Sequence, residues 1–419
     1  MNAPVNYDPA HEAWTMPLDR VDPADPARFV AGAELPYLAR LRRDAPVHYQ
    51  AENTMFGPYW SITRYNDIMQ VELNTKVFSS SWEHGGISVR SRPKELRIPM
   101  FIAMDPPVHD DQRKVVQPIV APFNLAKFEG LIRERTNIVL DSLPVNETFD
   151  WVEKVSIELT TMMLASLFDF PFEDRRLLTH WSDCATMPVE ANGFIKSEQH
   201  REEVFVELLT YFTKLWNERV NEPARPDLVS MLAHGEATRN MSPREYLGNL
   251  ILLIVGGNDT TRNSMTGGVL FMHQNPGEFA KLRANPKLVD SAVSEIIRYQ
   301  TPLAHMRRTA TEDIEFQGQQ IKAGDKVVMW YLSANRDDAV IEDPDAFIVD
   351  RKRPRQHISF GFGIHRCVGN RLAELQLKIL WEELLKRFER IEVVGEPKRV
   401  FSSFVRGYAS LPVRAIPRA

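Results

Sequence analysis

One long buried helix between Ser242 and Gln274 is the feature that most limits how this chain can fold. Ser242, Pro243 and Glu245 form a helix start, with serine as N-cap, proline at the first helical position and glutamate three residues after the cap. A helix from there to Gln274 is roughly 50 Å long at 1.5 Å per residue. Residues 250–255 are apolar on every side, so the helix is buried. Such a helix crosses a whole domain and predicts a large, mainly helical fold.

The rest of the chain indicates helices with a small amount of sheet. Residues 107–297 are mostly helical in pattern, and residues 36–43 add an earlier helix. Strand patterns occur at residues 59–63, 314–316, 326–330 and 391–394. We therefore predict a mainly α fold with a minor β region (α+β). We expect one domain over residues 1–419, with much of the sheet in about the first 100 residues and a helix-rich part from about residue 101.

Composition limits the partners and the compartment. A net charge of -5 gives no reason to expect nucleic acid as a partner. The two cysteines, Cys184 and Cys367, cannot form a disulfide framework and suit a reducing cytosol. Residues 1–20 contain prolines and polar residues where a signal peptide or anchor needs an apolar run. We expect a cytoplasmic protein without a membrane anchor, and a monomer.

The middle of the long helix has an unusual composition. Gly256 and Gly257 are followed by Asp259 and Thr260, so we expect the helix to be interrupted here. Two glycines cost about 1 kcal/mol each relative to alanine in a helix interior, and an unpartnered buried aspartate costs more. Glycines let a flat ligand approach the backbone, and a threonine hydroxyl can bond back to a carbonyl. A simple kink with a solvated polar turn is an equally good interpretation of these residues alone.

A glycine-rich loop presents Cys367 directly ahead of a predicted helix that begins near Arg371. The glycines let the backbone fold tightly around the sulfur, and the N–H groups of the next turn favour its thiolate. A lone cysteine is more often a buried free thiol. The spacing of Phe360, Gly363, Cys367 and Gly369 favours the metal ligand, because it matches the Phe-x-x-Gly-x-x-x-Cys-x-Gly loop of the haem-thiolate monooxygenases. The chain thus resembles a cytochrome P450.

The resemblance implies haem b, with Cys367 as the axial ligand of the iron and the P450 fold built around the cofactor. It assigns further haem contacts to Phe360, Gly369 and Gly256. Residues at the family's propionate-binding positions are His109, Arg113, Arg308 and His365. From the residues alone, a solvated helix face is the favoured interpretation of His109 and Arg113. Because Arg307 adjoins Arg308, either arginine could occupy the propionate-binding position.

The same resemblance assigns roles on the opposite face of the haem. Thr260 would hydrogen-bond the dioxygen, and Asp259 would relay protons to it, as O–O cleavage requires. Glu295 and Arg298 match the family's Glu-x-x-Arg pair, a structural ion pair. Its third partner is Arg351 or His357, and the sequence does not choose between them.

Electrons come from another protein in this interpretation. The chain has no Gly-x-Gly-x-x-Gly after a strand and no cysteine cluster, so no flavin or iron–sulfur module is indicated. The resemblance implies a [2Fe-2S] ferredoxin and its ferredoxin reductase as partners. Basic residues near the cysteine loop and the His109 helix would receive that donor: Lys114, Lys352, Arg353, Arg355, Arg366 and Arg371.

Residues 254–268 look closest to the soluble bacterial alkane hydroxylases of this family. The resemblance implies O2-dependent terminal (omega) hydroxylation of medium-chain n-alkanes, primary alcohols or fatty acids. Apolar candidates for the substrate channel are Val255, Leu303, Ala304, Met306 and Phe404, with an entrance loop at residues 187–195. A bulkier terpene or aromatic substrate is the alternative within the enzyme class. A haem-thiolate gas or redox sensor is the non-enzymatic alternative, and Asp259 with Thr260 argues against it and against a peroxide-using variant.

Overall fold

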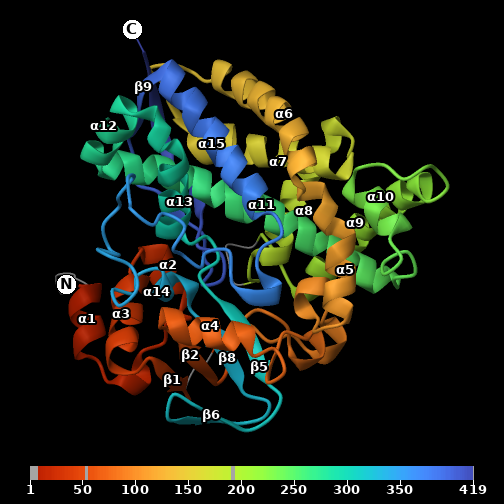
Figure 1. Cartoon of the computed structure of the whole chain (residues 1–419), viewed down its shortest axis with the longest axis vertical. Coiled ribbons are helices and arrows are strands. Elements are labelled where there is room, and N and C mark those ends of the chain that lie inside the picture. Colours follow the sequence, from red (N-terminus) through yellow and green to blue (C-terminus); the bar gives the residue numbers. More distant parts are fainter. Residues whose placement is uncertain (1–7, 52–54, 190–193, 419) are drawn as a thin grey trace.

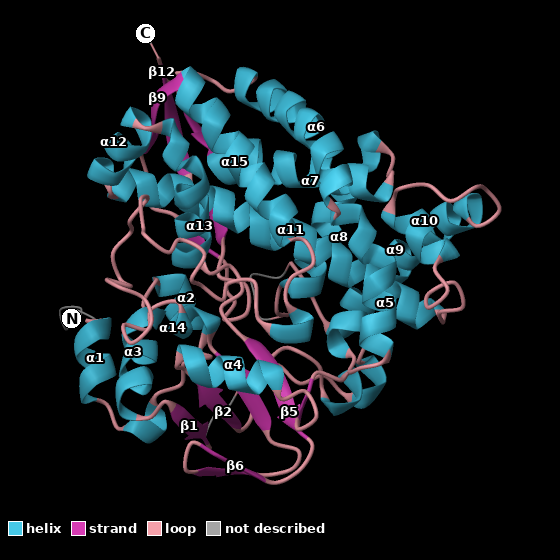
Figure 2. Ribbon diagram, in the orientation of Figure 1, coloured by secondary structure: helices cyan, strands magenta, loops and turns pink. Residues whose placement is uncertain are grey.

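The computed structural model describes residues 8–51, 55–189 and 194–418 (Figure 1). Figure 2 shows a large helical part and a smaller part that contains most of the strands. The helices of the described residues are α1 Pro9–Thr15, α2 Pro26–Ala31, α3 Glu34–Asp44, α4 Tyr65–Leu73, α5 Val108–Val116, α6 Pro122–Asp141, α7 Ile157–Phe168, α8 Arg176–Thr186, α9 Glu198–Arg219, α10 Leu228–His234, α11 Pro243–Gln274, α12 Pro276–Ala284, α13 Val289–Gln300, α14 Tyr331–Ala334 and α15 Asn370–Arg387. The strands are β1 Val47–Gln50, β2 Tyr59–Ile62, β3 Phe78–Ser79, β4 Thr148–Asp150, β5 Met306–Ala310, β6 Ile314–Phe316, β7 Gln319–Ile321, β8 Lys326–Met329, β9 Phe388–Val393, β10 Lys398–Arg399, β11 Tyr408–Ser410 and β12 Pro412–Pro417. The mainly α fold with a minor β region is confirmed.

Helix α11 is the predicted long helix, and it crosses the helical part of the molecule between α7, α8 and α13 (Figure 1). The Ser242 hydroxyl accepts a hydrogen bond from the Glu245 backbone N–H at 3.2 Å, which confirms the predicted start. The predicted interruption at residues 256–261 is wrong, because the helix runs through them without a break. The polar residues stay helical because Thr260 bonds back to the Gly256 carbonyl and Asp259 finds side-chain partners on α8.

The largest sheet has the strand order β1-β2-β8-β5-β3. Strands β1, β2 and β3 come from the first hundred residues, whereas β5 and β8 come from residues 306–329 and lie between β2 and β3. Strand β8 pairs in parallel with β2 and antiparallel with β5. The predicted strands at residues 59–63, 314–316, 326–330 and 391–394 correspond to β2, β6, β8 and β9. The late strands hold the two parts of the chain together; the one-domain division itself stays a prediction.

The two halves of α11 belong to different apolar clusters. Residues 246–254 pack with α5 and α7 to α10, and residues 265–272 pack with α13, α15 and the sheet of β4, β12 and β9. Residues 256–264 lie between these clusters and include the glycines and Thr260. The middle of the helix is thus free to face a cavity, while both ends are fixed by the core.

Candidate active site

A cavity of about 410 Å³ lies against the middle of α11. Its other walls come from α5, strand β5, the loop before α15, and residues 82–104 between β3 and α5, which we call the 82–104 segment. Most wall residues are apolar, and they include Leu164 and Leu167 of α7 and Phe205 of α9. The cavity therefore brings together segments that are far apart in the sequence.

Cys367 lines this cavity from the loop before α15. Gly361 and Gly363 adopt left-handed backbone with φ of 69° and 66°, and the Cys367 N–H donates to the Phe360 carbonyl at 2.8 Å. These turns direct the side chain into the cavity, where it is exposed. The surrounding protein nevertheless keeps bulk water from the thiol, and this desolvation raises its pKa, while the Gly369 N–H and the charge of Arg113 oppose the shift. The sulfur lies where a ligand in the cavity can reach it.

Four polar residues around the sulfur face the same cavity: His109, Arg113, Arg308 and His365. The two imidazole rings lie with centroids 4.2 Å apart. His109 Nδ1 bonds Asp110 at 2.7 Å and His365 Nε2 bonds Ser80 at 2.9 Å, but the buried His109 Nε2 and His365 Nδ1 have no partner among the described residues. Burial lowers the pKa of both histidines. Unpartnered ring nitrogens beside two arginines fit a ligand that has carboxylates.

The structure resolves the register at residues 307–308. Arg308 lines the cavity, and its Nη2 pairs with Glu72 at 2.5 Å, whereas Arg307 is absent from the cavity wall. Arg307 instead donates to the backbone carbonyls of His84 and Ser88. The assignment to Arg308 therefore agrees with its position.

On the side of α11, Gly256 and Thr260 both line the cavity. A Cβ placed on Gly256 would meet no atom within 4 Å, so the missing side chain leaves open space beside the backbone. The Thr260 hydroxyl donates to the Gly256 carbonyl at 2.9 Å, one helical turn back. A flat group could lie against this face of the helix, with Cys367 on the wall formed by the α15 loop. The residues present thus fit a planar cofactor that has carboxylates and takes a thiolate ligand.

Asp259 is buried and does not line the cavity. Its Oδ1 pairs with Arg262 Nη2 at 2.8 Å and accepts from Ser182 at 3.2 Å, and its Oδ2 accepts from Thr186 at 3.1 Å. Burial raises the pKa of Asp259, and Arg262 partly opposes this. Thr186 does line the cavity, so the residue that donates to the Asp259 carboxylate is itself part of the cavity wall. Sequence reasoning missed Ser182 and Thr186, although their spacing of four residues puts both hydroxyls on one face of α8.

Four of the five predicted channel residues line the cavity: Val255, Leu303, Met306 and Phe404. The prediction for Ala304 is wrong, since Ala304 is absent from the cavity wall. Its backbone N–H donates to the Phe404 carbonyl, and its side chain packs in a separate cluster with Phe29 and Trp330. Of the entrance loop predicted at residues 187–195, residues 190–193 lie outside the described part of the chain.

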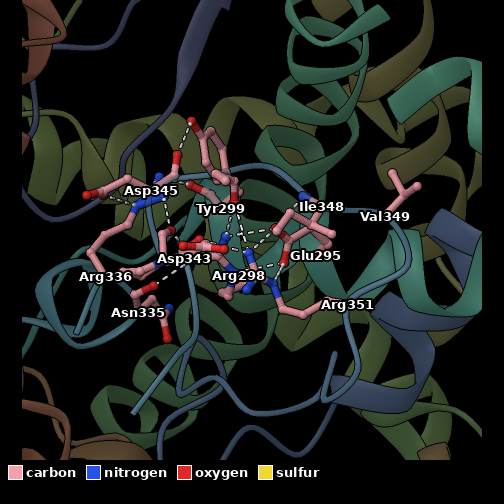
Figure 3. Close-up of polar contacts among 12 residues, drawn as sticks. Glu295, Arg298, Tyr299, Asn335, Arg336, Asp343, Asp345, Ile348, Val349 and Arg351 are labelled. Atoms are coloured by element: carbon pink, nitrogen blue, oxygen red, sulfur yellow. Dashed lines mark hydrogen bonds and ion pairs between the residues drawn. The ribbon is translucent and has the colours of Figure 1, made fainter. Parts of the chain in front are cut away.

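Glu295 and Arg298 lie outside the cavity, in a fully buried ion pair on α13 (Figure 3). Arg298 Nε and Nη2 each donate to the carboxylate at 2.8 Å, and Arg351 Nε donates at 2.9 Å. The third partner left open by the sequence is therefore Arg351 and not His357. Burial raises the pKa of Glu295, but the two arginines outweigh it and hold the pKa below its ordinary value. Because Arg298 also donates to the carbonyls of residues 335, 344 and 346, the cluster ties α13 to the loop after α14.

One cavity thus combines a thiol on one wall, a glycine-opened helix with an alcohol on another, and imidazole and guanidinium groups at its edge. A family model of cytochrome P450 matches residues 186–407. The linalool 8-monooxygenase of Pseudomonas putida is 36% identical over 96% of this chain and 100% of its own length. The methyl-branched lipid omega-hydroxylase of Mycobacterium bovis is 32% identical over 90% of this chain and 89% of its own length. The solved cytochrome P450-153 from Novosphingobium aromaticivorans has a TM-score of 0.88 and 48% identity, covering 94% of this chain and 99% of that one.

The chain belongs to the cytochrome P450 family, and it is a P450 monooxygenase. Proteins of this family bind haem b through a cysteine thiolate. Within the described residues, no helix is both long and apolar enough to cross a membrane.

Proposed function

We propose that this monooxygenase hydroxylates the terminal carbon of medium-chain n-alkanes, primary alcohols or fatty acids. The observation that supports this most is the mainly apolar cavity that joins Cys367 and Thr260 to the 82–104 segment. Methyl C–H bonds are the harder ones to break, so terminal attack requires walls that present only the chain end. The 48% identity to a cytochrome P450-153, and the relative named a lipid omega-hydroxylase, support the same choice.

Cys367 would ligate the haem iron, and His109, Arg113, Arg308 and His365 would bind its carboxylates. Gly256 would leave room for the ring, with Phe360 and Gly369 shaping the cysteine loop. When bound, the haem supplies the oxidising chemistry that inserts one atom of O2 into a C–H bond. The protein supplies orientation, exclusion of water and protons.

Thr260 would present its hydroxyl to the reacting oxygen from the cavity wall. In the structure that hydroxyl donates to the Gly256 carbonyl. It can turn toward the cavity if it gives up this one hydrogen bond. Asp259 would deliver protons through Thr186, which lines the cavity and whose hydroxyl donates to the carboxylate. A raised pKa suits a carboxyl that takes up and releases protons.

The electron donor would be a [2Fe-2S] ferredoxin served by its reductase. The six basic residues that the sequence places near the cysteine loop are all exposed, as an acidic partner requires: Lys114, Lys352, Arg353, Arg355, Arg366 and Arg371. Two of them also have acidic neighbours, since Arg355 pairs with Glu374 and Lys114 with Asp111. We also propose a cytoplasmic location, which suits a chain with two cysteines.

The second candidate function is hydroxylation of a terpene, favoured by the 36% identity to a linalool 8-monooxygenase over nearly the whole chain. The test supplies purified holoenzyme with a ferredoxin and its reductase, and with dodecane, dodecanoate or linalool. The proposal is supported if dodecane or dodecanoate gives a terminal alcohol, with a kcat/KM higher than that for oxidation of linalool. Oxygenation of linalool alone would favour the terpene. Binding of substrates without any O2-dependent product would indicate a sensor and refute both.

A further inference from the structure

The cationic residues on the cavity wall fall into two groups. One group surrounds Cys367 and is accounted for by the haem carboxylates: Arg113 and Arg308, with the two histidines. The other comes from the 82–104 segment and includes Arg90, Arg92 and Arg97. A mainly apolar cavity has no need of this second group for an alkane, since burying a guanidinium beside apolar surface is unfavourable without a partner. A cation of this group is available to a polar end of the substrate only where it does not already have an ionic partner.

Arg92 of the second group is already neutralised. Its Nη2 pairs with Glu198 at 3.0 Å, its Nη1 lies 4.0 Å from Glu202, and its guanidinium stacks on Phe205. These contacts connect the 82–104 segment to α9. Arg92 is thus a structural link rather than a free cation.

Arg97 differs, because it forms no ion pair in the described part of the chain. Its Nε donates to the Arg92 carbonyl at 3.0 Å, and its Nη1 donates to the Glu83 carbonyl at 2.5 Å. Nη2 donates no hydrogen bond to any described residue. Two backbone carbonyls thus hold the guanidinium in place while one nitrogen is left for a ligand. A fixed guanidinium loses little entropy when it binds a carboxylate.

The surroundings of Arg97 add positive charge. Arg307 is buried beside it, also without an ion pair in the described residues, and burial together with the charge of Arg97 lowers the pKa of Arg307 to about 10. Glu83 and Glu95 of the same segment are exposed and pair with neither arginine. Arg97 and Arg307 are therefore neighbouring cations that pair with no carboxylate of the described residues.

We infer that Arg97 binds the carboxylate of a fatty acid, whose chain then runs through the apolar part of the cavity and presents its methyl end beside Thr260. This rests on the proposed function and names one substrate class within it. Arg97 would be a specificity residue: it contacts substrate at the end opposite to the chemistry and decides between acids and uncharged chains.

The test compares dodecanoate, methyl dodecanoate and dodecane as probes. Their dissociation constants are measured by absorbance titration of the ferric haem in holoenzyme, for the wild type, Arg97→Gln and Arg97→Lys. We expect Arg97→Gln to weaken dodecanoate about 10- to 100-fold, the loss of a charge-assisted hydrogen bond, with less than about twofold change for the ester and the alkane. Arg97→Lys keeps the positive charge but lacks the planar guanidinium that can donate two parallel hydrogen bonds. Its dissociation constant for dodecanoate should therefore lie between those of the wild type and Arg97→Gln.

Lys94→Gln is the matched control, since Lys94 is exposed on the same segment and is absent from the cavity wall. It should leave all three constants unchanged. Equal losses for the three probes in Arg97→Gln would mean that Arg97 only holds the segment in place, and unchanged dodecanoate binding would mean that it meets no carboxylate. Either result overturns the inference. If the wild type oxidises no straight chain at all, it is the proposed function that fails.

Discussion

Replacing Glu295 with glutamine should cost this protein a large part of its stability. The carboxylate accepts hydrogen bonds from two nitrogens of Arg298, two of Arg351 and the Ile348 N–H, at 2.8 to 3.1 Å. Glutamine keeps the shape but removes the charge, and its NH2 group faces N–H donors. Both guanidinium groups then lose the one carboxylate partner that each has among the described residues, with Arg298 fully buried and 8% of the Arg351 side chain exposed.

The expected loss is about 3–5 kcal/mol, the usual cost of removing one partner from a buried ion pair. A typical native protein has a free energy of unfolding of about 5–15 kcal/mol, so the loss is a substantial fraction of the whole. The measurement is urea-induced unfolding of the holoprotein at pH 7.5, followed by tryptophan fluorescence. Glu129→Gln is the control, because Glu129 lies 3.5 Å from Arg133 with 54% of its side chain exposed. Its loss should not exceed about 0.5 kcal/mol.

A second measurement distinguishes unpaired charge from lost packing. Adding Arg351→Gln to Glu295→Gln removes one of the two stranded cations, so the double variant should be more stable than the sum of the single losses predicts. A loss below about 1 kcal/mol in Glu295→Gln, or strictly additive losses, would refute the reasoning.

Three other predictions concern the helix and its surroundings. Thr260→Ala should lower the fraction of consumed electrons that appears in product several-fold and release peroxide, measured as product per reduced nicotinamide; full coupling would contradict the role of the hydroxyl. Gly248→Ala should destabilise by about 1–3 kcal/mol in urea unfolding, because its Cβ would overlap the Pro99 carbonyl. Gly130→Ala on α6 is the control, since its Cβ would meet open space and it should not destabilise. His305, fully buried, has its pKa lowered from 6.5 to about 3 by burial, so its contribution to stability is present above pH 6.5 and lost as pH falls toward 3. The stability advantage of wild type over His305→Gln should therefore shrink by about 2 kcal/mol from pH 8 to pH 5, and a constant difference would contradict the assignment.

The sequence was sufficient where a short run of residues determines the local structure. The Ser242 cap and the Cys367 loop are such cases, because a cap and left-handed glycines are set by neighbours within a few positions. Their relative position followed only from the family resemblance. The structure then brought His109 and His365, 256 residues apart, to ring centroids 4.2 Å from each other.

Where the prediction failed, contacts distant in sequence decided the outcome. Residues 256–261 stay helical because Asp259 is satisfied by Arg262, three residues later, and by two hydroxyls on α8 that lie more than 70 residues earlier in the sequence. Ala304 turns away from the cavity because its backbone pairs with Phe404, about a hundred residues later. Arg97 and the rest of the 82–104 segment escaped notice because short 3-10 turns have no hydrophobic period to read.

The contact between α11 and the 82–104 segment fixes where Arg97 lies along the long helix. The Arg97 carbonyl accepts from Arg244 Nε at 3.1 Å in the first turn of α11, and Gly248 allows the backbone at Pro99 to approach one turn later. Thr260 follows Arg244 by sixteen residues, or about 24 Å of helix. The Arg97 side chain extends from this backbone position into the cavity. Because a helix holds a fixed rise per residue, a substitution at Arg244 or Gly248 that loosens this contact should shift the 82–104 segment relative to Thr260.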